Sequence, residues 1–138
     1  MKIYKGAVIF STIMTLIVSL ILWLCGFLFA DEIDDNLAIR AIIGEASNQG
    51  YEGMLAVACG IRNRGHLRGV YGANAGHVDN EPEWVWNLAR KAWTESEHNR
   101  IHQGTHWENI KSFGEPYWVA SMDKVYEYKD HVFYKEKR

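Results

Sequence analysis

The chain has 138 residues with a formal net charge of −2 at pH 7, so it is long enough for one domain and one further element. No basic stripe follows the sequence, which excludes a nucleic-acid-binding protein of the usual basic type. Its two cysteines, Cys25 and Cys59, lie in segments of different character, so no intramolecular disulfide is expected.

An uncharged apolar run occupies residues 7–30. As a helix, this run would span about 36 Å, enough for a bilayer core of roughly 30 Å. Lys2 and Lys5 precede it and several acidic residues follow, so the positive-inside rule places the N-terminus in the cytoplasm and the rest outside. The run is longer than the roughly 7–15 apolar residues of a signal peptide, which favours an uncleaved anchor over a cleaved signal. The expected division is therefore a membrane anchor or signal peptide at 1–30 and an exported domain at 31–138.

Helices are predicted over the first part of the exported domain. The spacing of apolar residues predicts one helix from Leu37 to Ala46 and a second from Tyr51 to Arg64, with Gly65 ending the second. Between Gly65 and Pro82 the chain is rich in glycine and predicts a long loop that lines a binding site. A third helix is predicted from Glu83 to about His98.

The remaining residues predict a smaller β element beside one more helix. QGTHW at 103–107 is typical of a turn entering a strand, and HVFYK at 131–135 alternates as a short strand does. Pro116 suits the first turn of a fourth helix over Tyr117–Tyr128. The predicted fold class is α+β, mostly helical.

Glu45 is a carboxylate at the end of one predicted helix, just before the loop that leads into the next. If the two helices pack as an αα corner, Glu45 lies at the rim of the corner, where a carboxyl group can act as a general acid. A lone glutamate on a helix is more often simply solvated.

Two sequence blocks carry a more specific pattern. Residues 40–65 read RAIIGEASNQGYEGMLAVACGIRNRG, and residues 104–135 read GTHWENIKSFGEPYWVASMDKVYEYKDHVFYK. The first resembles the opening motif A-x-x-x-Y-G-E-A-x-x-E-x-x-E-G-x-x-A-V-A-x-V-x-x-N-R of the SleB-type cell wall hydrolases, the spore-cortex-lytic enzymes and their relatives. The second resembles the G-A-T-H-[FY] segment, the P-x-W-A-x-x-M run and the closing G-x-H-x-F-Y-[RK] of the same family.

The resemblance implies a lysozyme-like catalytic domain that cleaves the β-1,4 bond between N-acetylmuramic acid and N-acetylglucosamine in peptidoglycan. It also implies that Glu45 is the catalytic acid, because Glu45 matches the glutamate of the family's Gly-Glu-Ala. A lytic transglycosylase needs one such carboxylate and no cofactor, whereas a hydrolase needs a second acid, for which Glu52, Asp79, Glu81 and Glu108 are available.

The same matches suggest residues that bind the sugar. Asn63 matches the family's Asn-Arg pair and either binds sugar amides or caps the helix end. Thr105 and His106 match its Thr-His pair, and Trp107 follows as a surface on which a sugar could stack. Tyr134 matches the closing block and could donate a hydrogen bond to Glu45, or pack as an end-strand aromatic residue.

The sequence departs from these motifs at several positions. Ile43 stands where the family has tyrosine, Gln49 where it has glutamate, and Asp130 where it has glycine before the last histidine. No residue stands between Gly104 and Thr105, where the family has alanine.

Two other functions remain open from the sequence. A non-catalytic peptidoglycan-binding relative would keep the fold without the activity. A zinc-dependent cell wall amidase would use His98, His102 and His106, of which the first two share a helix face if the helix continues that far. The first reading, with peptidoglycan as partner and no metal, is the one we expect.

Overall fold

The computed structural model describes residues 13–21 and 32–138, and it divides the chain into two units, Met1–Glu32 and Ile33–Arg138. Residues 13–21 form a helix with exposed side chains, and the other parts of the apolar run 7–30 lie outside the described residues. In the part of the chain that the structure describes, no helix combines the length and the apolar character needed to cross a bilayer.

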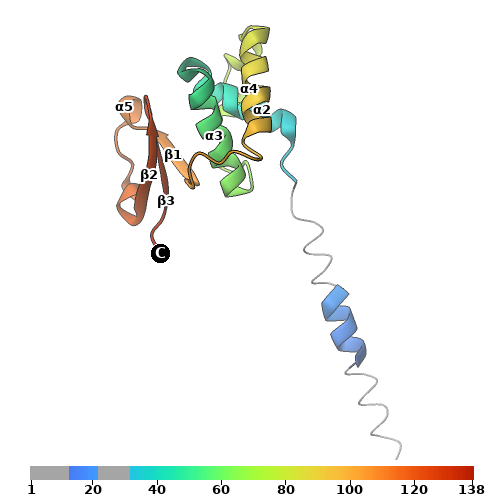
Figure 1. The fold of residues 1–138 in the computed structure, drawn as a ribbon. Helices are drawn as coiled ribbons and strands as arrows, with labels where there is room; N and C mark the ends of the chain where they lie inside the picture. The colour runs from blue at the N-terminus through green and yellow to red at the C-terminus, as the bar shows by residue number, and fades with distance from the viewer. Residues whose placement is uncertain (1–12, 22–31) are drawn as a thin grey trace, which may run out of the picture. The chain divides into compact units, whose positions relative to one another are not determined.

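The first two predicted helices of the domain are confirmed (Figure 1). Helix α2 spans Asp35–Ala46, and the Asp34 side chain caps it by accepting a hydrogen bond from the Leu37 amide. A 3-10 turn, η1 (Ser47–Gln49), leads directly into α3 (Gly50–Arg64). Helix α3 ends at Gly65 with a left-handed φ of 77°, as the sequence predicted.

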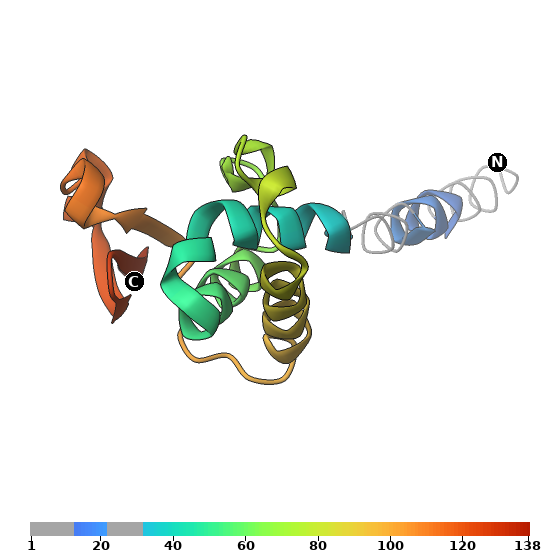
Figure 2. The same ribbon diagram turned by 90° about the horizontal axis from the view of Figure 1, so that it is seen from above.

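The long predicted loop after α3 contains two short 3-10 turns, η2 (Gly72–Asn74) and η3 (Val78–Asn80). The third predicted helix, α4, spans Glu83–Glu95 and so ends about one turn before the predicted boundary. Figure 2 shows η2 and η3 in the loop above α2.

The C-terminal part is a three-stranded antiparallel sheet in the order β1-β3-β2. The strands are β1 (His106–Asn109), β2 (Met122–Tyr128) and β3 (His131–Glu136). The short helix α5 (Ile110–Phe113) and the 3-10 turn η4 (Tyr117–Ser121) connect β1 to β2. The strands expected after QGTHW and at HVFYK are confirmed.

The predicted fourth helix over Tyr117–Tyr128 is wrong. Pro116 does introduce helical backbone, but only the five residues of η4, and the chain then becomes strand β2. The cause is a tertiary contact: Tyr126 pairs with Phe133 and Tyr128 with His131. The segment therefore becomes a strand because β3 is beside it, which the spacing of its own residues does not indicate.

Helix α3 lies at the centre of the domain, between the sheet on one side and α4 on the other (Figure 1). Its residues from Gly53 to Ile61 are all buried. Gly60 lets the sheet approach, because a Cβ at this position would come within 2.9 Å of the Trp107 ring. The fold class, α+β and mostly helical, is confirmed, and α3 fixes where β1 stands relative to α2.

Candidate active site

Glu45 lies in a cleft, where two hydrogen-bond donors hold its carboxylate. The backbone amide of Gly72 donates to Oε1 over 2.9 Å, and Nε1 of Trp107 donates to Oε2 over 3.3 Å. One donor comes from the loop after α3 and the other from strand β1, so three distant segments of the chain meet at this carboxylate. The side chain is half-buried rather than freely solvated.

Two glycines allow the loop to reach the acid. A Cβ on Gly44 would come within 1.9 Å of the Gly72 carbonyl oxygen, and a Cβ on Gly72 would come within 2.7 Å of Cγ of Glu45. The backbone of η2 therefore packs directly on the last turn of α2. The Gly-Glu pair at 44–45 thus has a structural reason, since glycine before the acid leaves room for the backbone of η2, which donates a hydrogen bond to Glu45.

An ion pair fastens the same loop to α2. Arg40 donates to both carboxylate oxygens of Asp79, at 2.6 and 3.2 Å, and to the Ala73 carbonyl oxygen at 3.2 Å. This pair holds the pKa of Asp79 below its usual range, the hydrogen bond from Arg40 being the main cause. Asp79 is therefore occupied in positioning the loop.

The cleft beside Glu45 has a volume of about 1000 Å³. One side is formed by α2, η1 and the loop after α3, and the other by β1, α5 and β3. The loop predicted to line a binding site lines this cleft. The lining residues that carry polar or aromatic side chains on the loop side include Asn48, Tyr71, Asn74, His77 and Glu81, and those on the sheet side include Trp107, Glu108, Asn109, Phe113 and His131.

A smaller, more polar cavity of about 300 Å³ adjoins the first. The two share Glu45, Tyr71, Trp107 and Glu108, so Glu45 stands where they meet. The smaller cavity is completed by Arg64, Gly69, His106 and Trp118. A groove therefore passes Glu45 and continues on both sides of it.

The predicted binding residues divide among this groove, a neighbouring cavity and the protein interior. Trp107 contacts Glu45, and His106 lines the smaller cavity. Burial, the main cause, lowers the pKa of His106, and the positive charge of Arg64 lowers it further. The Thr105 hydroxyl lies 2.9 Å from Nδ1 of His106. With Asn63, Thr105 lines a third cavity, which shares Arg64 and His106 with the smaller one.

Asn63 is engaged within the protein. Its amide nitrogen donates to the carbonyl oxygens of His102 and Gly104 at 2.9 and 3.0 Å, and its oxygen accepts from Arg100. These bonds tie the end of α3 to the segment that enters β1. The Asn63 side chain does not cap α3, because its amide nitrogen bonds to the segment 102–104 and the helix ends at Gly65. Asn63 also lies outside the lining of the two cavities that meet at Glu45.

Of the two roles that the sequence left open for Tyr134, the structure shows packing at the end of a strand and not the hydrogen bond to Glu45. It pairs with His106 across β1 and β3, while Trp107 pairs with Phe133, and paired residues share a face of a sheet. Tyr134 therefore lies on the face away from Trp107, where it is buried and packs edge-on against Trp118 at 5.4 Å. The donors that the sequence did not predict are Gly72 and Trp107.

His98, His102 and His106 do not form a metal site. Nε2 of His102 donates to the Ala56 carbonyl oxygen at 2.8 Å, and its Nδ1 accepts from the Gly104 amide at 3.0 Å, so both ring nitrogens are used. Among the residues the structure describes, no group of three or more histidine, cysteine or acidic side chains is arranged to hold a metal ion.

The fold has a known counterpart. The domain is similar to the crystal structure of the catalytic domain of the Bacillus cereus SleB protein, with a TM-score of 0.55 and 20% sequence identity. The match covers 73% of this chain and 88% of that one. A scan against protein-family models gives no match, and neither does a search of curated proteins. The domain therefore has a SleB-like fold.

Proposed function

We propose that this domain cleaves the glycan strands of peptidoglycan at the β-1,4 bond between N-acetylmuramic acid and N-acetylglucosamine, with Glu45 as the catalytic residue. The observation that carries the proposal is a single carboxylate, held by two donors, at the junction of two cavities. The motif resemblance around Glu45 and the likeness in fold to the SleB catalytic domain support it.

The two oxygens of Glu45 accept hydrogen bonds of different length, which suggests a different role for each oxygen in the reaction. Oε1 accepts the shorter bond from the Gly72 backbone and fixes the orientation of the group. Oε2, with the longer bond to Trp107, carries the proton and delivers it to the glycosidic oxygen as the C–O bond breaks and an oxocarbenium-like centre forms. The carboxylate then removes the proton from the muramyl 6-hydroxyl, whose oxygen closes an anhydro ring on the same sugar.

This lytic transglycosylase reaction needs no second carboxylate. Asp79 is paired with Arg40 and Glu52 is hydrogen-bonded to Tyr128, and neither acid lines the groove. Glu81 and Glu108 do line the groove. Because Glu108 borders both cavities beside Glu45, hydrolysis with Glu108 activating water is the second candidate. Mass spectrometry of the products separates them, since transglycosylation leaves an anhydromuramic end and hydrolysis leaves a reducing end.

The decisive experiment replaces Glu45 by glutamine in the full chain. Removing a general acid costs about a hundredfold to ten-thousandfold in rate, so Glu45→Gln is expected to release no measurable muropeptides from purified sacculi. Glu97→Gln, on an exposed site after α4, is the matched control and should keep activity. Retained release by a folded Glu45→Gln variant would end the proposal.

The two alternatives give different outcomes in the same assay. A non-catalytic binding relative would bind sacculi, release nothing, and lose nothing on Glu45→Gln. A zinc amidase would lose activity with EDTA and would release peptides rather than anhydro-disaccharides. Activity that resists EDTA and disappears with Glu45→Gln supports the acid mechanism alone.

The proposed substrate lies outside the cytoplasm, so residues 31–138 must be exported. The apolar run 7–30 and its flanking charges support this topology. Fused to the C-terminus, a periplasm-active reporter should work and a cytoplasm-active reporter should not; the reverse would place the domain on the wrong side of the membrane for this function.

A further inference from the structure

Arg64 is a half-buried cation at the groove that no described residue neutralises. It is the last residue of α3 and lines the smaller cavity together with Glu45 and His106. None of the ion pairs among the described residues includes it. Arg62 on the same helix differs, because it donates to the Ser96 hydroxyl and to the Trp93 carbonyl oxygen.

The position of this guanidinium is fixed by its neighbours rather than by a partner. It lies 5.7 Å from the centre of the Trp107 ring, and a Cβ on Gly69 would come within 3.3 Å of its Nη2. Gly69 itself has a left-handed φ of 74°, a conformation that suits glycine and keeps the space beside the guanidinium free. The side chain is thus placed at the cavity wall with its donors unused.

A partly desolvated guanidinium without a partner is unfavourable, and an incoming anion relieves it. Burial, the main cause, lowers the pKa of Arg64, and the nearby Glu45 opposes that effect. The planar fork of arginine matches a carboxylate with two parallel hydrogen bonds. Among anions, a carboxylate therefore suits the unused donors of Arg64 well.

The groove presents Arg64 on one side of Glu45 only. The larger cavity, on the other side, carries amide side chains such as Asn48, Asn74 and Asn109, which suit neutral acetamido sugars. The smaller cavity carries Arg64 and His106. A glycan strand that crosses Glu45 therefore meets a cation on one side and amides on the other.

We propose that Arg64 binds a carboxylate on the side arm of a muramyl residue, and so makes the site selective for muramyl-containing strands over plain N-acetylglucosamine polymers. The inference rests on the proposed function. The two sugars differ by the lactyl ether of the muramyl residue, which ends in a carboxylate or continues into a peptide with carboxylates of its own. Glu108 opposes an anion in the same cavity, but its Oε1 is turned to accept a hydrogen bond from the Asn109 amide.

Arg64 could instead act only through Glu45, as a positioning residue that tunes the charge of the acid. The two roles differ in substrate dependence. A cation that serves Glu45 affects cleavage of every glycan equally, whereas a cation that binds the substrate matters only when the substrate carries a carboxylate.

The test compares three substrates with the unmutated full chain: peptide-bearing glycan strands, strands stripped by an amidase to expose the lactyl carboxylate, and stripped strands whose carboxylates are reduced to alcohols. We expect KM for the reduced strands to be about tenfold or more above that for the better of the two carboxylate-bearing substrates, the size of a charge-assisted hydrogen bond. Which of those two is better identifies the source of the carboxylate, lactyl or peptide.

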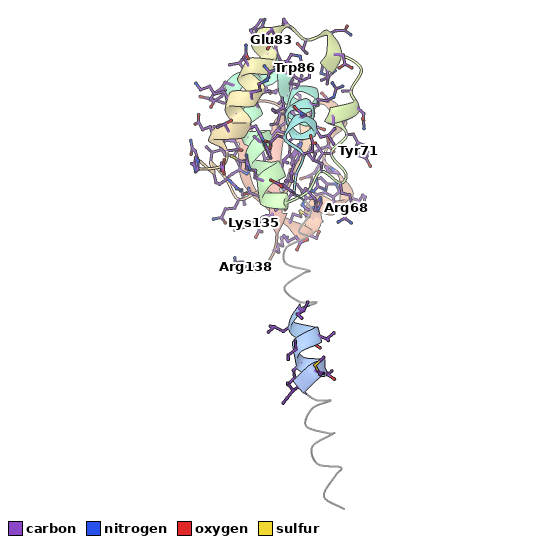
Figure 3. The ribbon with its side chains drawn as sticks, turned by 90° about the vertical axis from the view of Figure 1, so that its right-hand side faces the viewer. Arg68, Tyr71, Glu83, Trp86, Lys135 and Arg138 are labelled. Atoms are coloured by element: carbon purple, nitrogen blue, oxygen red, sulfur yellow. The ribbon has the colours of Figure 1, made fainter. Side chains whose placement is uncertain are left out.

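The variants complete the comparison. Arg64→Gln should raise KM for the carboxylate-bearing strands to the level of the reduced strands and leave the reduced strands unchanged. Arg64→Lys, which keeps the charge but loses the fork, should fall between them. Arg68→Gln is the matched control, an exposed arginine at the same edge of the domain as Tyr71 (Figure 3). Thermal unfolding of each variant shows whether the fold is kept.

Equal KM for reduced and unreduced strands would overturn the inference, as would a loss in Arg64→Gln that is the same on both. In either case the protein would still cleave glycan strands, and the proposed function would stand. If instead the unmutated chain cleaves none of the three substrates, the proposed function fails, which is a distinct outcome.

Discussion

The groove has a helical wall, formed by α2, η1 and the loop after α3, and a sheet wall, formed by β1, α5 and β3. The two walls contact Glu45 in different ways. On the helical wall, backbone meets backbone: Gly72 lies against the last turn of α2 and donates to Glu45, and the ion pair from Arg40 fastens the loop. On the sheet wall, a side chain makes the contact, since the indole of Trp107 reaches Glu45 while its ring packs over Gly60. The acid is thus oriented from one side by a backbone donor and from the other by a side-chain donor.

Among the changes considered next, the largest loss of stability and activity is expected when a side chain is added at Gly72, where the loop packs on α2. A Cβ on Gly72 would lie 2.6 Å from the Ala41 carbonyl oxygen and 2.7 Å from Cγ of Glu45, so the loop has to move. Overpacking of this kind costs about 1–3 kcal/mol, and loss of the Gly72 donor should reduce kcat by about tenfold or more. Chemical unfolding and muropeptide release measure the two effects in Gly72→Ala.

Gly76 is the matched control in the same loop, because a Cβ there would meet nothing within 4 Å. Gly76→Ala should keep both stability and activity. Equal behaviour of Gly72→Ala and Gly76→Ala would mean that the backbone contact does not hold the acid.

Gln49 and Asp130, two departures from the resembled motifs, contact each other where the walls meet. Nε2 of Gln49 donates to Oδ2 of Asp130 at 3.3 Å, and Nζ of Lys129 donates to the Gln49 carbonyl oxygen at 2.7 Å. The pair joins η1 to the turn between β2 and β3. A glutamate at 49 would place a second carboxylate against Asp130, so the amide at 49 is the side chain compatible with the aspartate at 130.

Replacing Gln49 by glutamate should therefore lower the free energy of unfolding at pH 7 by about 1–2 kcal/mol, since a partly buried hydrogen bond is lost and two like charges face each other. Lys111 and Gln49, in that order, hold the pKa of Asp130 below its usual range, so this carboxylate is charged at pH 7. The double change Gln49→Glu with Asp130→Asn restores a donor and should recover most of the loss in chemical unfolding. No recovery would show that the two positions are independent.

The local parts of this fold could be predicted from the sequence, and the long-range parts could not. The periodicity and capping residues of 35–65 predict two helices to within two residues, and the glycine-rich loop lines the cleft beside Glu45. The β2 segment was missed because Tyr126 and Tyr128 become strand only through pairing with β3. A local sequence pattern does not indicate which other segment will pair with it.

The same division applies to the candidate site. Glu45 was predicted from its motif. Trp107 was predicted as a surface on which a sugar could stack, and not as a donor to Glu45. The donor from Gly72 could not be predicted, because a backbone amide 27 positions away leaves no side-chain signal. The sequence left two roles open for Tyr134, a hydrogen bond to Glu45 or packing at the end of a strand. Only the register of β1 and β3, which pairs Tyr134 with His106, places it on the face away from Trp107 and decides for packing.

Acid conditions should weaken the contact between α3 and the sheet. Burial, the main cause, lowers the pKa of His102, which bridges Ala56 and Gly104 as the neutral ring. The unfolded chain, with a histidine pKa of about 6.5, binds the proton more readily, so this contribution to stability is complete above about pH 6.5 and is lost as the pH falls below it. Urea unfolding between pH 7.5 and 5 should show the decline, and His102→Gln, which cannot titrate, should show a smaller one. An unchanged slope in His102→Gln would assign the decline to other groups.

The smallest effect is expected on the rim of the groove, where exposed aromatic residues contribute to binding and not to folding. Tyr71 and Phe113 are each 80% exposed and line the large cavity from the loop side and the sheet side. Stacking on a sugar face is worth about 1 kcal/mol, so Tyr71→Ala and Phe113→Ala should each raise KM for long glycan strands about fivefold with no change in thermal unfolding. Tyr117→Ala provides the control, since Tyr117 is 94% exposed and lies outside the cavity lining. If KM is the same for all three variants, the rim makes no specific contact with the glycan. If KM rises only in Phe113→Ala, the sheet wall alone binds the glycan strand, and Tyr71 only lines the boundary between the two cavities.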